Sequence, residues 1–239
     1  MNKKGLRIVL TGGASGLGLA IATTLQFSGQ GHKVFVWDKK FGCGEHDVVN
    51  PSSECIADAI DLMDGVDILI NCAGVNKIDW LEKFTEQQWD EVVDTNAKGI
   101  FMMTKAFLPE LVKNKGVVLN IVSNAAHMPM TCSLAYNASK AAAHIMTQQL
   151  ARELTPKYGI TVFGIAPNKL CGTGMSESID DQVVETRGWT KEYAHQYQLN
   201  GLLLREETPP ESVADLVVFL LNNMQVTKYL SGCILPFGV

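Results

Sequence analysis

The stretch TGGASGLG, residues 11–18, decides the fold of this chain. Before it, the apolar run LRIVLT (6–11) is rich in branched residues and predicts a strand that is buried on both faces. After it, LGLAIATTLQF (17–27) repeats apolar residues at a spacing close to 3.6 and predicts a helix that ends before Gly29 and Gly31. The glycine-rich stretch is therefore the turn between a strand and a helix.

The rest of the chain continues this alternation. A second strand at 34–37 completes a strand–helix–strand unit over residues 6–38, which implies a parallel sheet. Further strands are predicted at 47–49, 66–71, 116–123, 160–166 and 233–235, and helices at 51–63, 85–96, a following stretch to 113, 135–157 and 210–221. We expect one α/β domain over residues 1–239, a Rossmann-type, doubly wound and mostly parallel sheet with helices on both faces.

The glycine-rich turn predicts a binding site for a diphosphate. A helix N-terminus carries unpaired backbone N–H groups and a partial positive charge, so it binds phosphates without any basic side chain. Glycine supplies backbone freedom there and leaves out the Cβ that would block the phosphates. We therefore expect a dinucleotide to contact Gly12, Ser15, Gly16, Leu17 and Gly18.

Asp38, at the end of the second predicted strand, indicates which dinucleotide binds. An acid at this place accepts hydrogen bonds from the ribose hydroxyls of the adenosine half and repels a 2′-phosphate, which favours NAD over NADP. Lys39 and Lys40 follow directly and are able to bind a phosphate, so NADP stays possible.

Composition and charge exclude several other classes of protein. The net charge is −5 and no basic stripe is present, which argues against a nucleic-acid partner. No apolar run reaches the ~18 residues of a membrane span and the first residues lack the apolar core of a signal peptide, so we expect a cytoplasmic protein without a membrane partner. The six cysteines form no CxxC pair and lack histidines at metal-ligand spacing, so we expect reduced thiols and no metal site.

The spacing of the turn differs from the common GxGxxG motif. It reads Thr-Gly-x-x-x-Gly-x-Gly from Thr11 to Gly18, and in this the chain resembles the short-chain dehydrogenase/reductase family, in its compact single-domain branch. About residues 6–238 can be laid on the family pattern. The segment NCAG (71–74) is similar to the family's NNAG, with Cys72 in place of an asparagine. The resemblance implies that this segment contacts the cofactor, mostly through its backbone, at Asn71, Ala73 and Gly74.

The resemblance also implies a catalytic set. The family has an asparagine in a helix, a serine at the end of a strand and the motif YxxxK on a later helix, which correspond here to Asn96, Ser123, Tyr136 and Lys140. Ser123 precedes Tyr136 by 13 residues, as the family arrangement requires. Because four motifs occur in the right order and register, the resemblance is specific.

Residue chemistry gives these side chains distinct roles. Tyr136 and Lys140 are four residues apart and share one helix face, so the ammonium is expected to lower the phenol pKa from about 10. Tyr136 would then act as general acid or base, while Ser123 holds the substrate oxygen. The resemblance implies that Lys140 also binds the nicotinamide ribose, and we expect Asn96 to position a water that links Lys140 to solvent.

The resemblance adds positions that fit the family less closely. Asp47 and Val48, in the short strand expected at 47–49, correspond to a pair that contacts adenine, and the short segment before residue 71 implies one missing helix. Pro167 matches the family, but Asn168 stands in place of a glycine. Thr173 lies one residue later than the threonine that contacts the carboxamide.

Substrate choice is expected to depend on residues 127–133 and on 174–208, the latter within the polar, irregular segment 168–208. We expect this segment to contain some helical pieces and to form a closing lid over about residues 172–208. Candidate pocket residues are His127, Met128, Met130, Met175, Trp189 and Tyr193.

The apolar helices at 97–113 and 135–157 indicate a homodimer or homotetramer, as in the family. The sequence thus predicts an NAD(P)-dependent oxidoreductase that acts on a small alcohol or ketone. A non-catalytic dinucleotide sensor on the same fold, and a related lyase or epimerase, are the alternatives.

Overall fold

The computed structural model describes residues 5–41 and 46–238, so Cys43 lies outside the described part. Within this part six strands form one sheet in the order β2-β1-β3-β4-β5-β6, and each neighbouring pair is parallel. The strands are β1 (Arg7–Thr11), β2 (Lys33–Trp37), β3 (Ile68–Asn71), β4 (Val117–Ile121), β5 (Thr161–Pro167) and β6 (Ile234–Phe237). The predicted α/β class and the doubly wound parallel sheet are confirmed.

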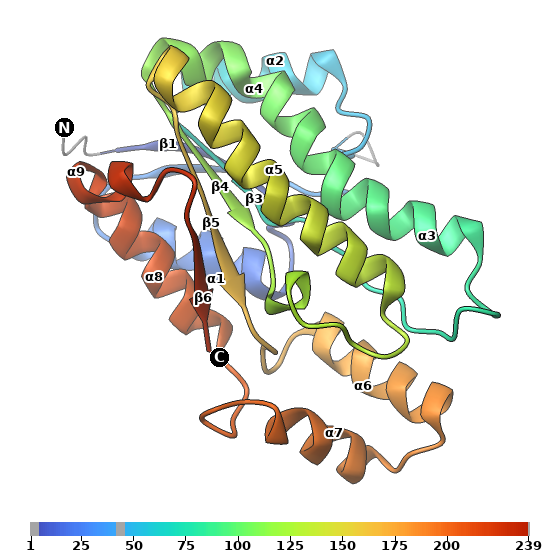
Figure 1. Ribbon diagram of the computed structural model, residues 1–239. Coiled ribbons are helices and arrows are strands. Elements are labelled where there is room, and N and C mark those ends of the chain that lie inside the picture. Colours follow the sequence, from blue (N-terminus) through green and yellow to red (C-terminus); the bar gives the residue numbers. More distant parts are fainter. Residues whose placement is uncertain (1–4, 42–45, 239) are drawn as a thin grey trace.

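Helices cover both faces of the sheet (Figure 1). One face packs against α1 (Gly16–Phe27) and α8 (Pro210–Asn222), and the other against α2 (Ser53–Met63), α4 (Gly99–Asn114) and α5 (Leu134–Tyr158). Successive residues of a strand point to opposite faces, and apolar side chains are buried on both. In β1, Ile8 and Leu10 belong to the core with α1, whereas Val9 belongs to the core with α2.

The predicted helix 85–96 and its successor form a single bent helix. Thr85 and Gln88 make a capping box that starts α3 (Glu86–Val93). The chain then continues through a π-helical turn at Asp94–Lys98 directly into α4. Such π-helical turns are frequent at functional sites, and this one contains Asn96.

The strand expected at residues 47–49 is not formed. Val48 and Val49 are consecutive, yet both are buried in the same core cluster, whereas a strand would send them to opposite faces. The backbone N–H of Val49 also donates to the Asp47 side chain instead of a neighbouring strand. The segment is therefore a bend that closes the core next to β2, and the sheet has one strand fewer than predicted within the described residues.

The segment 168–208 is mostly helical rather than irregular. It contains α6 (Gly174–Arg187) and α7 (Lys191–Asn200), which lie beyond the carboxyl ends of β5 and β6 (Figure 1). Thr173 and Thr190 start these helices by accepting hydrogen bonds from the backbone N–H groups three residues later. After α8 the chain adds the short helix α9 (Met224–Thr227) before β6.

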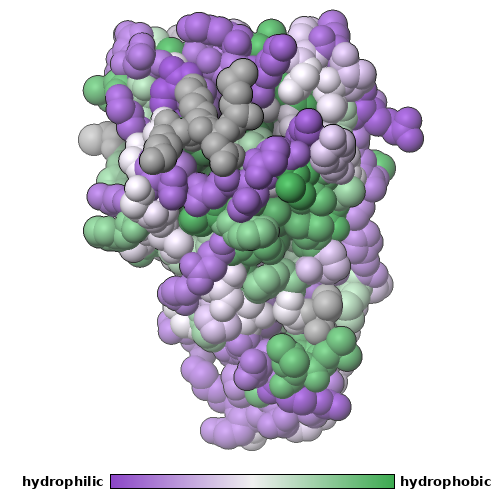
Figure 2. Space-filling view, turned by 90° about the vertical axis from the view of Figure 1, so that its left-hand side faces the viewer, coloured by the Kyte–Doolittle hydropathy of each residue, from purple (hydrophilic) through white to green (hydrophobic). Residues whose placement is uncertain are grey.

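Apolar side chains are exposed on more than one face. Ile100 and Met103 of α4 are buried, and Met103 packs in the core with strand residues, whereas Phe101 and Ile145 are 49% and 60% exposed. Figure 2 shows a different side of the molecule, where apolar residues gather in one area of the main body and in another at the end formed by α6, α7 and the chain that follows them. None of the described helices is both long and apolar enough to cross a bilayer.

Candidate active site

The predicted site residues meet at the carboxyl edge of the sheet. Strands β1, β3, β4 and β5 are neighbours in this order, so the segments that follow them lie side by side. These segments are the glycine turn after Thr11, the NCAG segment from Asn71, the loop that contains Ser123, and the chain after Pro167. The sheet order thus brings four separate sequence motifs to one edge.

The glycine turn packs tightly against the NCAG segment. The Thr11 hydroxyl accepts hydrogen bonds from the backbone N–H groups of Cys72 and Ala73, both at 3.0 Å. Gly12 has φ +71°, and a Cβ built on it would lie 2.7 Å from the Ala73 Cα. A Cβ on Gly18 would overlap the Gly12 carbonyl oxygen. The protein's own backbone therefore requires these two glycines, in addition to any need of a bound diphosphate.

The start of α1 fits a diphosphate. Ser15 is the N-cap, and among the described residues its side chain makes no capping hydrogen bond, while the first turn carries no acid. The N–H groups at Gly16, Leu17 and Gly18 have no partner within the helix and are available to an anion. Gly16 adopts φ +50°, a conformation that favours glycine.

Asp38 supports the turn from the neighbouring strand. Its carboxylate accepts hydrogen bonds from the backbone N–H groups of Ala14 and Lys40, each at 3.0 Å. Lys39 is engaged in an ion pair with Asp47, with Nζ and Oδ2 3.2 Å apart. Asp38 thus lies at the turn as predicted, and one of the two lysines that could bind a 2′-phosphate has an acidic partner.

Lys140 is buried at the centre of the edge. Its ammonium donates to the carbonyl oxygen of Ile121 at 3.0 Å and lies 5.8 Å from the centre of the Tyr136 ring. A Cβ built on Gly74 would lie 3.7 Å from Nζ, so the ammonium also borders the NCAG segment. Burial lowers the pKa of Lys140 to about 8.

The expectation of a lowered pKa for Tyr136 is wrong for the chain alone. Burial raises the pKa of the phenol, and the hydrogen bond with Ser123 offsets part of this rise. The physical reason is that burial of the ring outweighs the effect of Ser123, while the Lys140 ammonium donates to the Ile121 carbonyl. The structure places Ser123 close enough to Tyr136 for its side chain to lower the pKa of the phenol.

Two predicted residues use their side chains inside the protein. Asn96 pairs with the backbone of Val75, accepting from its N–H at 2.8 Å and donating to its carbonyl at 2.9 Å. Asn71 donates to the buried Asn120 side chain at 2.9 Å, so its amide faces the core behind the site. Any contact of Asn71 with a cofactor would therefore involve its backbone.

The positions beyond β5 are arranged less regularly. Pro167 ends β5, and the Asn168 amide donates to the Gly238 carbonyl at 2.8 Å, so the residue in place of the family's glycine ties this segment to the end of β6. Thr173 is buried, and its side chain would be 3.6 Å from a Cβ on Gly16. Thr173 thus borders the glycine turn, whereas Val48 packs in the core against Gly99.

Cys72 and Ser139 are residues at the site to which the sequence pattern gave no role. Burial raises the pKa of the Cys72 thiol to about 12, and the nearby Lys140 ammonium lowers it, so the thiol is neutral beside Tyr136 and Lys140. Ser139 is fully buried and bonded to Asn96. Its position inside YNASK was visible in the sequence, but its hydrogen-bond partner was not.

An apolar hollow of about 330 Å³ lies at the start of α5. Of the predicted pocket residues, Met130 lines it, together with Asp79, Trp80, Leu81, Pro129, Cys132, Leu134 and Asn137. Trp189 and Tyr193 pack against each other, with ring centres 5.0 Å apart. His127 contacts His144 at a ring distance of 4.4 Å. Of the six predicted pocket residues, Met130 is the one that lines this hollow.

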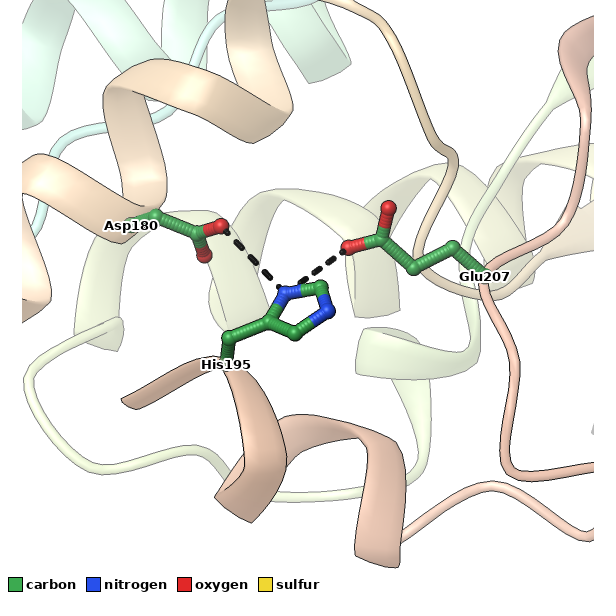
Figure 3. A group of neighbouring side chains, drawn as sticks. All are labelled: Asp180, His195 and Glu207. Carbon is green, nitrogen blue, oxygen red and sulfur yellow. Dashed lines mark ion pairs between the residues drawn. The ribbon is translucent and has the colours of Figure 1, made fainter. Parts of the chain in front are cut away.

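A network of charged side chains links α6 and α7 to the segments that precede and follow them, and Figure 3 shows three of its members, Asp180, His195 and Glu207. The Lys169 ammonium, before α6, pairs with Asp180 at 2.5 Å and with Glu207 at 3.1 Å. His195 of α7 approaches the same two carboxylates, at 3.9 and 3.7 Å. In the part of the chain that the structure describes, one group of side chains could hold a metal ion. It consists of a carboxylate oxygen each from Asp180 and Glu207 and a ring nitrogen of His195. The Lys169 ammonium already pairs with an oxygen of each carboxylate, so we regard the network as a structural ion-pair cluster.

Replacing Lys169 by methionine is expected to loosen α6 and α7. The side chains of Lys169, Asp180 and Glu207 are 12–16% exposed, so the change leaves two largely buried carboxylates without their cation. Breaking a buried ion pair from one side costs about 3 kcal/mol. Hydrogen–deuterium exchange should show that amides of α6 and α7 exchange faster in the variant than in the natural chain, whereas amides of α1 exchange at the same rate in both.

Lys191→Met is the matched control. Lys191 of α7 pairs with Asp181 of α6 at 3.1 Å, but both side chains are exposed, so the substitution should leave exchange unchanged. Equal protection of α6 and α7 in the Lys169 variant and the natural chain would contradict the assigned role of the network.

Known proteins with similar sequences and folds belong to the family that the motifs indicate. A family model described as short chain dehydrogenase matches residues 45–184. The chain is 32% identical to a sorbitol-6-phosphate 2-dehydrogenase of Klebsiella pneumoniae, over 97% of this chain and 94% of the relative. It is 30% identical to a 3-oxoacyl-(acyl-carrier-protein) reductase of Staphylococcus epidermidis, over 75% of this chain and 68% of the relative. Among solved structures, a variant of an actinorhodin polyketide ketoreductase with NADPH has the same fold, with a TM-score of 0.85 at 24% identity over 99% of this chain and 97% of that one.

Proposed function

Because the chain belongs to the short-chain dehydrogenase family, we propose that it is an NAD(P)-dependent oxidoreductase that interconverts a secondary alcohol and a ketone. The observation that supports this most directly is the proximity of Ser123, Tyr136 and the buried Lys140 at the edge that carries the glycine turn. The two relatives are named for reactions of alcohols and ketones, which agrees with this proposal.

The side chains of the site would act on the substrate oxygen. A bound nicotinamide supplies the hydride acceptor or donor. Ser123 donates a hydrogen bond to the substrate oxygen and holds it next to the Tyr136 phenol, which gives a proton to a ketone or takes one from an alcohol. Lys140 contributes its positive charge, which stabilises the phenolate once the proton has left. A sensor without catalysis would not need this arrangement, and no observation favours it.

The cofactor would lie across the glycine turn. We propose that the N–H groups from Ser15 to Gly18 hold the diphosphate, that Asp38 binds the adenosine ribose, and that Ala73 and Gly74 border the nicotinamide half together with Lys140. Asp38 favours NAD, and Thr173 lies close enough to Gly16 to contact the diphosphate side.

Asp38→Asn is expected to change the cofactor preference. The amide keeps an oxygen that accepts from the Ala14 N–H, but it loses the charge that repels a 2′-phosphate. We expect the ratio of the Kd values for NADPH and NADH to fall about tenfold, measured by the fluorescence of the bound reduced cofactor.

Asp58→Asn serves as the control for net charge, because Asp58 is exposed on α2. This variant should keep the original ratio. If Asp38→Asn also keeps it, Asp38 does not select the cofactor.

The reaction itself is tested by a screen. Purified protein is mixed with NADH or NADPH and a panel of ketones and keto acyl thioesters, and in the reverse direction with NAD or NADP and secondary alcohols. The absorbance of the reduced nicotinamide reports turnover. Cofactor binding without turnover of any compound in the panel would remove the support for the proposed reaction class.

We also propose that the active protein is a homodimer or homotetramer, and that residues 172–208 close over the substrate. The exposed apolar side chains of α4 and α5, such as Phe101 and Ile145, support the first proposal. The position of α6 and α7 beyond the carboxyl edge supports the second (Figure 1).

A further inference from the structure

Ser139 lies at the centre of a buried hydrogen-bond chain behind the site. The Asn96 amide donates to the Ser139 hydroxyl at 3.0 Å, and this hydroxyl donates to the backbone carbonyl of Tyr136 at 2.8 Å. Asn96 and Ser139 are 1% and 0% exposed, so water does not compete for these bonds.

The same Asn96 amide holds the NCAG side of the cleft. It also accepts from the N–H and donates to the carbonyl of Val75, the residue after Gly74. The chain of bonds therefore runs from Val75 through Asn96 and Ser139 to the backbone of Tyr136. It links the segment expected beside the nicotinamide to the first turns of α5, which carry Tyr136 and Lys140.

We propose that Ser139 is a positioning residue that fixes Tyr136 and Lys140 relative to the Ala73–Val75 segment. This inference rests on the proposed function, in which a proton and a hydride must leave or enter at two neighbouring substrate atoms. A shift of the order of an ångström between the phenol and the cofactor segment lowers the rate strongly without removing any group that touches the substrate.

The same helix contains a matched control. Thr147 is also fully buried on α5, and its hydroxyl accepts from the Asn120 amide at 2.9 Å and donates to the Ala143 carbonyl at 2.7 Å. Ser139→Ala and Thr147→Val each remove one buried hydroxyl from the helix and leave one asparagine N–H without its partner. The two variants differ in their distance from Tyr136. The Ser139 hydroxyl bonds to the Tyr136 carbonyl, whereas Thr147 lies 11 residues after Tyr136 in the sequence.

The first measurement compares kinetics. Ser139→Ala should lower kcat for a ketone at least about tenfold, with a KM for the ketone within about threefold of the natural value. Thr147→Val should keep kcat within about threefold, although both variants should unfold at lower denaturant concentration. The inference is overturned if the two substitutions lower kcat equally, or if Ser139→Ala lowers stability and leaves kcat intact.

The second measurement does not depend on turnover. The titration of Tyr136 is taken as the difference in ultraviolet absorbance between each protein and the same protein with Tyr136→Phe. In Ser139→Ala the midpoint should move toward that of a free phenol, because a looser Tyr136 admits water near Lys140 and Cys72. In Thr147→Val it should not move. An unchanged midpoint in Ser139→Ala contradicts the inference.

These measurements separate the two proposals. If the natural chain turns over no alcohol or ketone, the proposed function fails, while the phenol titration still decides the role of Ser139. If Ser139→Ala does not fold, Ser139→Cys is used, which keeps a similar volume with a weaker hydrogen-bonding group. Ser139→Cys should also have a lower kcat and a titration midpoint closer to that of a free phenol. A kcat and a midpoint equal to those of the natural chain would reject the positioning role.

Discussion

Tyr136→Phe is expected to lower kcat/KM for a ketone by about 10²- to 10⁴-fold, the usual contribution of a positioned general acid. The substitution removes the phenol oxygen that hydrogen-bonds with Ser123 and leaves the ring and the backbone of α5 in place. Steady-state kinetics with the reduced cofactor and a substrate from the screen would measure the loss. The Kd for NADH should stay within about threefold, because Lys140 keeps its bond to the Ile121 carbonyl.

Tyr158→Phe is the control for this experiment. It makes the same chemical change at the other end of the same helix, where Tyr158 packs against the core and neighbours Lys157. Turnover should be unaffected there. If Tyr136→Phe loses cofactor binding together with activity, Tyr136 has a structural role and the assignment of the proton donor is wrong.

The spacing of motifs predicted which residues meet, because the topology of a parallel sheet fixes where strand ends lie. A strand before each of Gly12, Cys72 and Ser123 was readable from branched apolar runs, so the shared carboxyl edge followed. The bend at Val48 and Val49 was not readable, since two adjacent valines fit a buried strand as well as a buried bend. The contact of both residues with one core cluster depends on helices distant in the sequence.

The helices α6 and α7 and the electrostatics of the site depend on packing that cannot be read from the sequence. Helices α6 and α7 bury few side chains, such as Val183 and Ala194, so their apolar periodicity is weak. The pKa of Tyr136 depends on how deeply the ring is buried and where the Lys140 ammonium points. Four-residue spacing indicates a shared helix face, but it does not determine the carbonyl to which the ammonium donates.

Gly18→Ala is expected to abolish cofactor binding. A Cβ at this position would overlap the Gly12 carbonyl oxygen, and both atoms belong to backbone that is held in place, with Gly12 pressed against Ala73. The start of α1 must therefore move away from the turn, which separates the N–H groups that would hold the diphosphate. Losing two charge-assisted hydrogen bonds of about 1.5–3 kcal/mol each weakens binding more than about 100-fold, measured by the fluorescence of bound NADH.

The comparison with Gly201→Ala shows whether the position or the added methyl group matters. Gly201 has φ −79°, and a Cβ there would meet the Gln198 carbonyl oxygen at 3.4 Å, an ordinary contact, so that variant should bind NADH normally. Overpacking at Gly18 should also lower the free energy of unfolding by about 1–3 kcal/mol, which denaturant titration detects. A Gly18→Ala protein that unfolds earlier but binds NADH as tightly as the natural chain would mean that the dinucleotide does not use the start of α1. In that case the glycines of residues 12–18 would serve the packing of β1, α1 and the NCAG segment, and the cofactor site would have to lie elsewhere.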